Sequence, residues 1–387
     1  VVTGGEWRRE KVEFDATLGS FDRSISAGFA ELRVQVVNSG MSIPLIDELA
    51  VTLAARWNRY SDFGDVTNPQ FGVIWRPHRD VTVRAAYADT FRPPSLFELH
   101  LPKLSLSTAV LDPRRPGAPS PVTLVTGGNR DLVPVEGQLL SAGLSLSPSA
   151  IPGLKMNTNV WRIEVDERIT FFAMSTLLAN EAALPERVIR AAPTPQDIAA
   201  GRPGQLLVLD ISRLNLGRLE TTGLDFNVSY DFDTRFGRFV PGLMGTWIDE
   251  FETVDVPGTA KRDRINVATE LGTIVRWRAA VTLGWGRGPF STFAAARYVP
   301  SYDDASAGVR TGQAVASQTT FDVQGSIDLG GLIAGHEFWE GMSLTLGATN
   351  VTDEMPPFSQ VNTLAGFDLS QGDLKGRFVY LRLGKTF

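Results

Sequence analysis

Three histidines, His78, His100 and His336, are the side chains of this chain best suited to acid–base or metal chemistry near neutral pH. A nucleophilic or metal site would also need serine, acidic or further histidine partners at a matching spacing, and none accompanies any of the three. The sequence also lacks a Gly-x-Ser-x-Gly elbow and a phosphate-binding glycine loop. We therefore predict no catalytic residue, no metal site and no cofactor; His100, in a predicted long loop, is the candidate residue if the protein is a hydrolase.

A group of acidic residues, Glu164, Asp166 and Glu167, is the second feature that could do chemistry, because two close carboxylates can act as acid and base. The same stretch alternates in polarity and contains Arg162 and Arg168, which balance the negative charge. Such alternation is typical of a strand with one wet face. We interpret the group as the polar face of a strand and not as a catalytic pair.

The composition excludes several classes of protein. The chain has 387 residues, 43% of them hydrophobic, and no run of eighteen apolar residues, so a helical membrane protein is excluded. A membrane β-barrel remains compatible with the mean hydropathy of -0.03, because only every second residue of each strand faces lipid. A net charge of -6 without a basic stripe argues against nucleic acid, and the lack of cysteine excludes disulfides and thiolate metal sites.

Many segments alternate between apolar and polar residues with a period of two, which predicts β-strands between two different environments. The clearest segments are 49–58, 81–88, 224–232, 321–329 and 342–349. Their polar positions are rich in Asp, Asn, Ser, Thr, Gly and Arg, which suits a wet lumen. The predicted lumen-facing residues are Arg56, Arg84, Arg162, Asp225 and Arg382.

The predicted connections alternate between short and long. Short connections lie at 77–79, 148–153, 233–237 and 287–289, and long ones without predicted secondary structure lie at 92–134, 173–204, 301–318 and 353–374. This alternation predicts an all-β, antiparallel transmembrane β-barrel with long extracellular loops and short periplasmic turns. Its candidate ligand contacts are the loops 101–128, 174–204, 303–317 and 354–372. A soluble β-sandwich is the alternative fold.

Aromatic residues near the predicted strand ends point to two interfacial girdles, as in proteins whose strands cross a membrane. They are Trp57, Tyr60, Trp75, Tyr87, Phe91, Tyr230, Phe232, Tyr298 and Tyr302. Packing of these rings across the strands of a soluble sheet is the alternative explanation.

The end of the chain alternates strictly. Val379, Leu381, Leu383 and Phe387 fall on one face of a predicted strand, interrupted only by Lys385. A strand of this kind that ends on an aromatic residue resembles the closing strand of bacterial outer-membrane β-barrels. In those proteins the barrel assembly machinery reads this C-terminal signal, so the resemblance implies an insertion signal here.

One phrase of the sequence is similar to the most recognisable barrel motif of TonB-dependent outer-membrane receptors. It consists of Phe91, Arg92, Pro93, Pro94, Ser95 and Leu96, followed by Glu98. Further similar stretches are 29–32, 56–64, 68–72, 75–77, 129–136, 223–226 and 348–353. The resemblance covers nearly the whole chain from Ser26 onward.

The resemblance implies a role in the cell outer membrane. Barrels of this family import scarce, large substrates such as iron–siderophores, cobalamin or saccharides, driven by the TonB–ExbB–ExbD complex of the inner membrane. Residues 1–387 would be one domain, the C-terminal portion of the barrel, with about fourteen strands of a probable twenty-two. The expected partners are a plug domain from a missing N-terminal part, the TonB complex reached through that part, outer-membrane lipids, the barrel assembly machinery and an unidentified small molecule, but no nucleic acid.

Two alternative functions stay open on the sequence alone. An open sheet in hydrocarbon would leave about ten backbone groups unpaired, at several kcal/mol each. Either the missing strands come from an N-terminal part that precedes Val1, or the fourteen strands close on themselves as a passive channel. A hydrolase or adhesin built on the same barrel is the second alternative.

Overall fold

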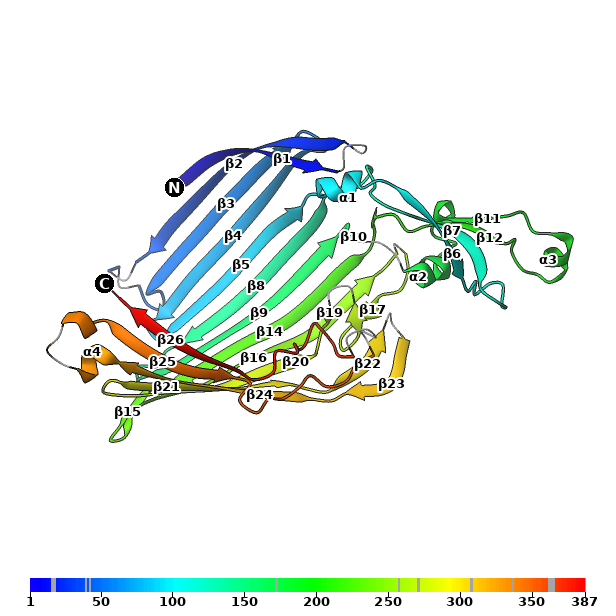
Figure 1. The fold of residues 1–387 in the computed structure, drawn as a ribbon. Coiled ribbons are helices and arrows are strands. Elements are labelled where there is room, and N and C mark those ends of the chain that lie inside the picture. Colours follow the sequence, from blue (N-terminus) through cyan, green and yellow to red (C-terminus); the bar gives the residue numbers. More distant parts are fainter. Residues whose placement is uncertain are drawn as a thin grey trace.

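The computed structural model describes residues 1–14, 19–38, 40–41, 43–170, 173–256, 258–269, 272–306, 309–333, 335, 337–360 and 366–386. Its main feature is one large sheet in which fourteen antiparallel strands follow each other in chain order (Figure 1). These strands are β1 (Val2–Glu13), β2 (Ser20–Val37), β3 (Glu48–Tyr60), β4 (Gly64–His78), β5 (Val81–Arg92), β8 (Val135–Leu146), β9 (Leu154–Asp166), β14 (Arg218–Tyr230), β16 (Gly237–Val254), β20 (Trp277–Arg287), β21 (Phe290–Val299), β24 (Gln318–Asp328), β25 (Met342–Thr349) and β26 (Phe378–Lys385). The predicted all-β, antiparallel class and the count of about fourteen strands are confirmed.

Two short strands extend this sheet to sixteen, and both pair with β16. They are β15 (Phe232–Thr234) and β17 (Arg262–Asp263). Figure 1 shows that the sheet curls into a shell, and within the described residues β1 and β26 stand at its two ends, each paired on one side. In the part of the chain that is described, no helix is both long and apolar enough to cross a membrane.

The connections emerge at two rims, because neighbouring antiparallel strands reverse direction. One rim, the short-turn rim, carries the connections 38–47, 79–80, 147–153, 231–236, 288–289 and 329–341, the last with α4 (Leu329–Leu332) and η2 (Glu337–Trp339). The opposite rim, the long-loop rim, carries 93–134, 167–217, 255–276, 300–317 and 350–377, and also the short connections 14–19 and 61–63. The predicted alternation of short and long connections is therefore confirmed, although the short-turn rim also has two connections of intermediate length.

The register of the strands divides the side chains into two faces, since paired residues of adjacent strands lie on the same face. Leu53 pairs with Phe71, Phe71 with Tyr87, and Tyr87 with Leu140, which forms a continuous apolar row across four strands. Leu140 keeps 56% of its surface exposed and Leu381 keeps 69%, so no described element covers this face. A β-sandwich would bury such residues against a second sheet, and that alternative is wrong.

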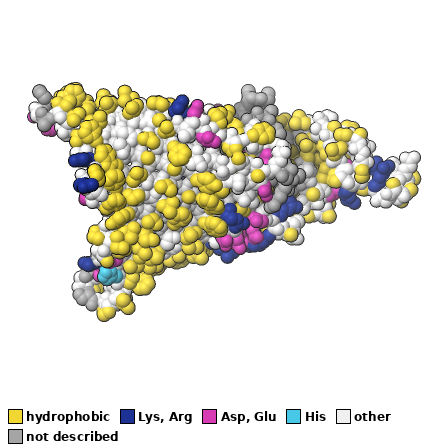
Figure 2. Space-filling view, turned by 90° about the horizontal axis from the view of Figure 1, so that it is seen from below, with side chains coloured by type: hydrophobic (Ala, Val, Ile, Leu, Met, Phe, Trp, Pro, Cys, Tyr) yellow, Lys and Arg dark blue, Asp and Glu magenta, His cyan; other side chains and the backbone are white. Residues whose placement is uncertain are grey.

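The apolar face is the outside of the shell. Figure 2 looks at the shell from below and shows hydrophobic side chains over a broad area in the left part of the view, bordered below the middle by a group of charged side chains of both signs. Two segments of the long-loop rim lie against the other, polar face: Pro94 contacts Arg23, and Gln371 lines a small cavity with Arg278. The polar face is therefore the concave one.

The two longest connections fold together into a lobe that projects from the long-loop rim (Figure 1). Its sheet has the order β11 (Val188–Arg190), β12 (Leu206–Asp210), β7 (Ser120–Thr126) and β6 (Leu104–Val110), with β12 and β7 parallel. Its helices are α2 (Met174–Ala179), η1 (Pro185–Arg187) and α3 (Pro195–Ala199). We predicted loops without secondary structure here, and that prediction is wrong.

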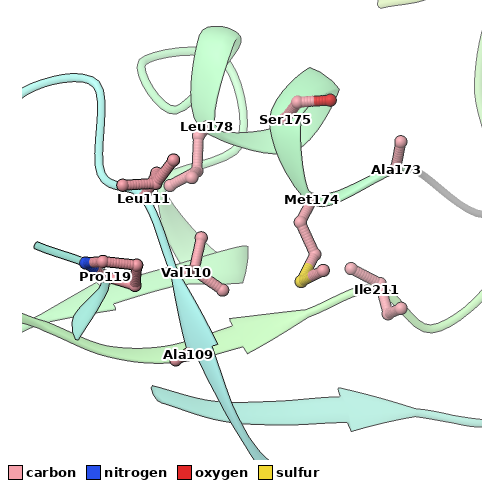
Figure 3. Close-up of a pocket in the computed structure, with 9 residues that line it drawn as sticks. All are labelled: Ala109, Val110, Leu111, Pro119, Ala173, Met174, Ser175, Leu178 and Ile211. Carbon is pink, nitrogen blue, oxygen red and sulfur yellow. The ribbon is translucent and has the colours of Figure 1, made fainter. Parts of the chain in front are cut away.

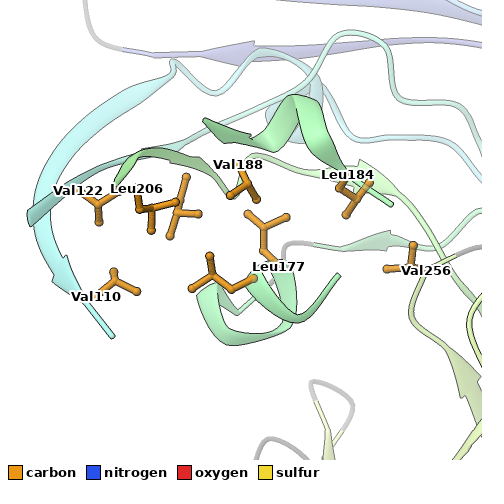
Figure 4. Close-up of a cluster of buried hydrophobic side chains, with 9 residues drawn as sticks. Val110, Val122, Leu177, Leu184, Val188, Leu206 and Val256 are labelled. Carbon is orange, nitrogen blue, oxygen red and sulfur yellow. The ribbon is translucent and has the colours of Figure 1, made fainter. Parts of the chain in front are cut away.

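The lobe has a hydrophobic core of its own, shown in Figure 4. Its buried members are Val110, Val122, Leu177, Leu178, Leu184, Val188, Leu206, Leu209 and Val256. Leu177 and Leu209 are completely buried, as in the interior of a small domain. Val208 of β12 pairs with Thr123 of β7, which is far away in the chain. The sheet of the lobe therefore forms only when the connections 93–134 and 167–217 fold together.

The remaining short elements also belong to the long-loop rim. They are α1 (Leu96–His100), the pair β10 (Ile169–Thr170) and β13 (Leu214–Asn215), the pair β18 (Ala268–Thr269) and β19 (Gly272–Thr273), and the pair β22 (Tyr302–Ser306) and β23 (Val309–Val315). All the pairs are antiparallel.

Candidate functional site

The exposed arginines of the concave wall include Arg84 on β5, Arg278 on β20 and Arg382 on β26. Register places each of them on the polar face: Arg84 pairs with Gly143, Arg278 with Thr246 and Arg382 with Thr345. Among the described residues, no carboxylate forms an ion pair with any of the three. A concave surface with unneutralised guanidinium groups attracts anions and can bind carboxylate or phosphate groups in a bidentate manner.

Two other predicted lumen residues also lie on this wall, but their charges are engaged. Arg56 donates to Glu6 at 2.8 Å and to Asn58 at 2.9 Å. Asp225 accepts hydrogen bonds from the Trp161 indole at 3.0 Å and from the Thr246 hydroxyl at 2.7 Å. Arg56 therefore ties β3 to β1, and Asp225 ties β14 to its neighbours β9 and β16, so both charges are used within the wall.

Arg162 corrects the prediction for the lumen face. It pairs in register with Leu140 and Thr222, which places it on the outer, apolar face of β9. There it contacts Glu164 at 2.6 Å and Glu220 at 3.8 Å. The strand continues beyond the apolar zone, and its charged end forms a surface ion-pair cluster instead of a lumen contact.

Further members complete this outer cluster near the long-loop rim. Arg218 contacts Glu220 at 2.8 Å, and Lys261 contacts Glu220 at 2.7 Å and Glu252 at 3.1 Å. Charges of both signs thus mark where the apolar face ends toward the long-loop rim on β9, β14 and β16. We name this group, Arg162, Glu164, Arg218, Glu220, Glu252 and Lys261, the outer ion-pair cluster.

Aromatic side chains border the apolar face at both ends. Toward the long-loop rim, Trp277 lies across from Trp247, and its ring centroid is 5.2 Å from that of Tyr298. Trp75 occupies the same face near the short-turn rim and is 39% exposed. Tyr60 and Tyr302 do not belong to a girdle, because each is only 5% exposed and faces the interior of the molecule.

The motif that resembles TonB-dependent receptors builds the start of the connection after β5. Ser95 caps α1 by accepting from the Glu98 amide at 3.1 Å, while the Glu98 carboxylate accepts from the Ser95 amide at 2.8 Å. Arg92 donates to the same carboxylate at 2.9 Å. Leu96 is buried, and Phe91, Pro93 and Pro94 lead the chain from β5 into this turn.

Arg23 on β2 fastens this turn to the wall. The side chain is 3% exposed, and its guanidinium donates to the Pro94 carbonyl oxygen at 2.7 Å. It also lies 2.7 Å from Glu10 and 5.1 Å from the centre of the Tyr60 ring. The motif residues therefore anchor the start of the connection 93–134 to the wall at the long-loop rim.

The histidines do not form a catalytic site in the described residues. His100 stacks on Phe21 with ring centroids 4.0 Å apart, and its Nδ1 is buried without a hydrogen-bond partner among the described atoms. Burial, and then the nearby Arg130, lower the pKa of His100. His78 contacts Asp80 at 3.7 Å in a turn, and His336 lies outside the described residues. No three metal-binding side chains meet in the described part of the chain.

The last strand has the predicted faces. Val379, Leu381 and Leu383 pair with Ala348, Leu346 and Leu344 on the apolar face, whereas Arg382 lies on the polar one. Phe387 lies outside the described residues. An insertion signal at this end of the chain stays a prediction.

The lobe adds a second candidate binding surface. An open cavity of about 640 Å³ lies beside α2, and apolar side chains line most of it (Figure 3). Ion pairs hold the surrounding chain: Arg190 contacts Asp112 at 2.5 Å and Glu181 at 2.7 Å. The Arg190 guanidinium lowers the pKa of both Asp112 and Glu181, so the two carboxylates stay ionised at neutral pH.

Other connections of the long-loop rim are tied together by buried polar contacts. The Tyr302 hydroxyl donates to Asp368 at 3.0 Å, and the Ser359 hydroxyl donates to Asp304 at 3.0 Å. These bonds join the connection 300–317 to the connection 350–377. Beneath them, Arg278 and Gln371 line a cavity of about 80 Å³ against the wall.

The sequence alone did not point to Arg278, Trp161 or Arg23. Arg278 follows Trp277 where the apolar alternation of β20 has barely begun, so no pattern marked it. Trp161 is an aromatic residue on the polar face, where its indole N–H donates a hydrogen bond to Asp225. Arg23 would have been found only by knowing that β2 passes beneath the turn at Pro94.

Comparison with known proteins identifies the family. The family model described as TonB dependent receptor-like, beta-barrel matches residues 2–351, and the chain belongs to this family. A comparison with curated proteins gives no match.

Solved structures share the fold at low sequence identity. A variant of the ferric enterobactin receptor of Pseudomonas aeruginosa is 14% identical with a TM-score of 0.66, over 98% of this chain and 50% of its own. The siderophore receptor PirA of Acinetobacter baumannii is 12% identical with a TM-score of 0.63, over 100% of this chain and 52% of its own. The FrpB iron transporter of Neisseria meningitidis is 13% identical with a TM-score of 0.55, over 94% of this chain and 44% of its own. The chain thus spans about half the length of these structures.

Proposed function

We propose that this chain forms the C-terminal barrel portion of an outer-membrane receptor that imports a scarce, anionic small molecule with energy from TonB. The single observation that carries this proposal is the pairing of an exposed apolar outer face with a concave wall that presents Arg84, Arg278 and Arg382. Membership of the TonB-dependent receptor-like family supports energised transport as the role of such a barrel.

The proposed placement in the membrane follows from the two faces. The apolar face contacts acyl chains, the aromatic residues lie at the headgroups, and the outer ion-pair cluster lies in water above them. The long-loop rim then faces the cell exterior and the short-turn rim faces the periplasm.

The remaining parts of the transporter are proposed to come from an N-terminal part of the same protein. In the part of the chain that the structure describes, β1 and β26 are each paired on one side only. Hydrocarbon does not tolerate unpaired backbone groups, and further strands would close the barrel between them. A plug domain inside the barrel and the segment that binds the TonB–ExbB–ExbD complex would belong to that part.

Siderophores are the substrate class that fits best. The similar structures include a receptor for ferric enterobactin and a siderophore receptor, and the exposed arginines would attract an anionic member of this class. Cobalamin and saccharides stay as alternatives within the same transport role.

Uptake in whole cells tests the proposal. Cells that lack other iron receptors would receive the full protein, and uptake of radioactive iron would be followed with a panel of ferric siderophores, each with and without TonB. Uptake of at least one complex that stops in cells without TonB is the expected result. Steady ion conductance of the purified protein in planar bilayers, with no TonB-dependent uptake, would instead favour the passive channel.

A further inference from the structure

The cavity beside α2 is unlike the rest of the long-loop rim because its surface is almost entirely apolar. Val110, Leu111, Met174, Leu178 and Ile211 line it, and Ser175 is the one polar side chain among its nine lining residues (Figure 3). No charged side chain lines the cavity. A ligand group that fills it must therefore be uncharged and largely apolar.

The cavity is a built feature and not a gap in a loose loop. Val110 and Leu178 also belong to the core of the lobe, so one wall of the cavity is the outer surface of packed hydrophobic residues. Arg190 binds Asp112, next to the lining residue Leu111, and Glu181, just beyond α2. The frame is thus held in place before any ligand arrives, which lowers the entropic cost of binding.

The size of the cavity favours a small molecule as its occupant. About 640 Å³ lies within the range of roughly 300–1,000 Å³ that is common for small-molecule sites. A stable protein interface uses about 20–30 residues on each side, whereas nine residues line this cavity. Met174 adds an adaptable side chain that can follow the shape of different apolar groups.

The position of the cavity argues against membrane lipid as the occupant. The lobe projects from the long-loop rim (Figure 1), and the outer ion-pair cluster lies between the apolar face and this rim on β9, β14 and β16. Acyl chains of the bilayer contact the apolar face and not the lobe.

We propose that the lobe pocket, formed by the six side chains named above, binds the apolar part of the imported molecule. The inference rests on the proposed import function and specifies its substrate class. The cargo is amphiphilic, with an anionic portion for the arginines of the concave wall and an aliphatic or alicyclic portion for the lobe. The lobe pocket would select for that apolar portion before the cargo reaches the wall.

The test uses a reporter placed in the pocket. The chain has no cysteine, so Ser175→Cys can be labelled at one place in this chain with a trifluoromethyl thiol reagent. Straight-chain alkanoates from butanoate to octanoate would be titrated into the labelled full protein in lipid nanodiscs and followed by fluorine NMR. Glutarate, which has charge at both ends, serves as the ligand control.

A saturable shift that tightens about fourfold with each added methylene is expected, because a buried methylene contributes about 0.8 kcal/mol. Leu111 is 65% exposed, so Leu111→Asp leaves the fold intact while placing a charge in the pocket, and it should weaken octanoate binding at least tenfold. The matched control is Leu106→Asp, a lobe residue that is 51% exposed and lies outside the lining, and it should bind like the parent.

Several results would overturn the inference. They are a shift that never saturates, an affinity that ignores chain length, or equal binding by Leu111→Asp and Leu106→Asp. TonB-dependent uptake without alkanoate binding would refute the binding role of the lobe pocket and leave the proposed import function standing. Saturable alkanoate binding by a protein that imports nothing would support the binding pocket and refute the proposed import function.

Discussion

The guanidinium of Arg23 donates a hydrogen bond of 2.7 Å to the carbonyl oxygen of Pro94, and this contact joins strand β2 to the turn that begins the connection 93–134 of the long-loop rim. The two residues are far apart in sequence, and the bond between them is buried. It connects a charged donor to a backbone acceptor that water cannot reach. Bonds of this kind stabilise more than exposed ones, because breaking them leaves a buried group unsatisfied.

Replacing Arg23 by Ala should therefore loosen the motif turn. The loss of a charge-assisted bond and of the contact with Glu10 should cost about 1–3 kcal/mol of local stability. Amide hydrogen exchange in α1 should then accelerate roughly 5- to 150-fold. Arg33→Ala, on the same strand and exposed, is the control and should leave α1 unchanged. Equal exchange in both variants would show that Arg23 does not anchor the turn.

The lobe should lose stability in acid. Arg190 lowers the pKa of Asp112 and Glu181 in the folded lobe below their ordinary values of 3.8 and 4.5. The ionised carboxylates therefore stabilise the lobe fully above those ordinary values, and this contribution disappears as pH falls through the lower folded values. Hydrogen exchange at pH 7 and pH 3, corrected for the intrinsic rate, should show the lobe opening while β14 stays protected. A lobe equally protected at both values would contradict the role of the ion pairs.

The same network can be broken at neutral pH. Arg190→Met leaves the nearly buried Asp112 without its partner, which should destabilise the lobe by about 3 kcal/mol. Arg202→Met is a milder comparison, because Arg202 is 40% exposed and Asp197 keeps Arg115 as a second partner. Limited proteolysis of the connection 167–217 would report the difference, and similar cleavage of both variants would oppose it.

The concave arginines should matter for cargo and Arg162 should not. On the proposed function, Arg84→Gln removes a cation that faces the anionic substrate and should raise the concentration for half-maximal uptake about tenfold. Arg162→Gln removes the same charge from the outer face of the shell and should leave uptake unchanged. Reduced uptake by both variants to the same extent would show that net charge, and not the concave wall, attracts the cargo.

The two faces of one strand should differ in how much a new charge destabilises the fold. Val281 lies on the apolar face of β20 and is 56% exposed, so Val281→Arg should cost about 2–4 kcal/mol of unfolding free energy in lipid vesicles. The next residue, Thr282, lies on the concave face of β20, and Thr282→Arg should lower the free energy of unfolding by less than about 1 kcal/mol. Urea unfolding of the two variants in vesicles measures this difference. Equal losses would contradict the membrane contact of the apolar face.

The strands could be predicted from the sequence because their period of two is a local property. Leu53 and Tyr87 stand in the predicted alternating segments 49–58 and 81–88, and both pair with Phe71 in the apolar row. Arg162 was misplaced because its own strand does not show where the apolar zone ends. That limit depends on Glu220 and Lys261, which come from elsewhere in the chain.

The lobe could not be predicted for a different reason. Its apolar residues follow neither a helical nor a strand period over any long stretch, because its elements are short. Strand β7 pairs with β12, although the two wall strands β8 and β9 lie between them in the sequence. The arginines of the wall were partly predictable, since Arg84 and Arg382 alternate with apolar neighbours.

The parallel pairing of β7 and β12 also constrains how this receptor can be engineered or diversify. Both connections supply residues to one hydrophobic interior, so a graft of either alone into a foreign barrel would leave Leu177 or Val122 facing water. Transplantation should succeed only when both segments move as a pair. Recombination between relatives should likewise preserve them together.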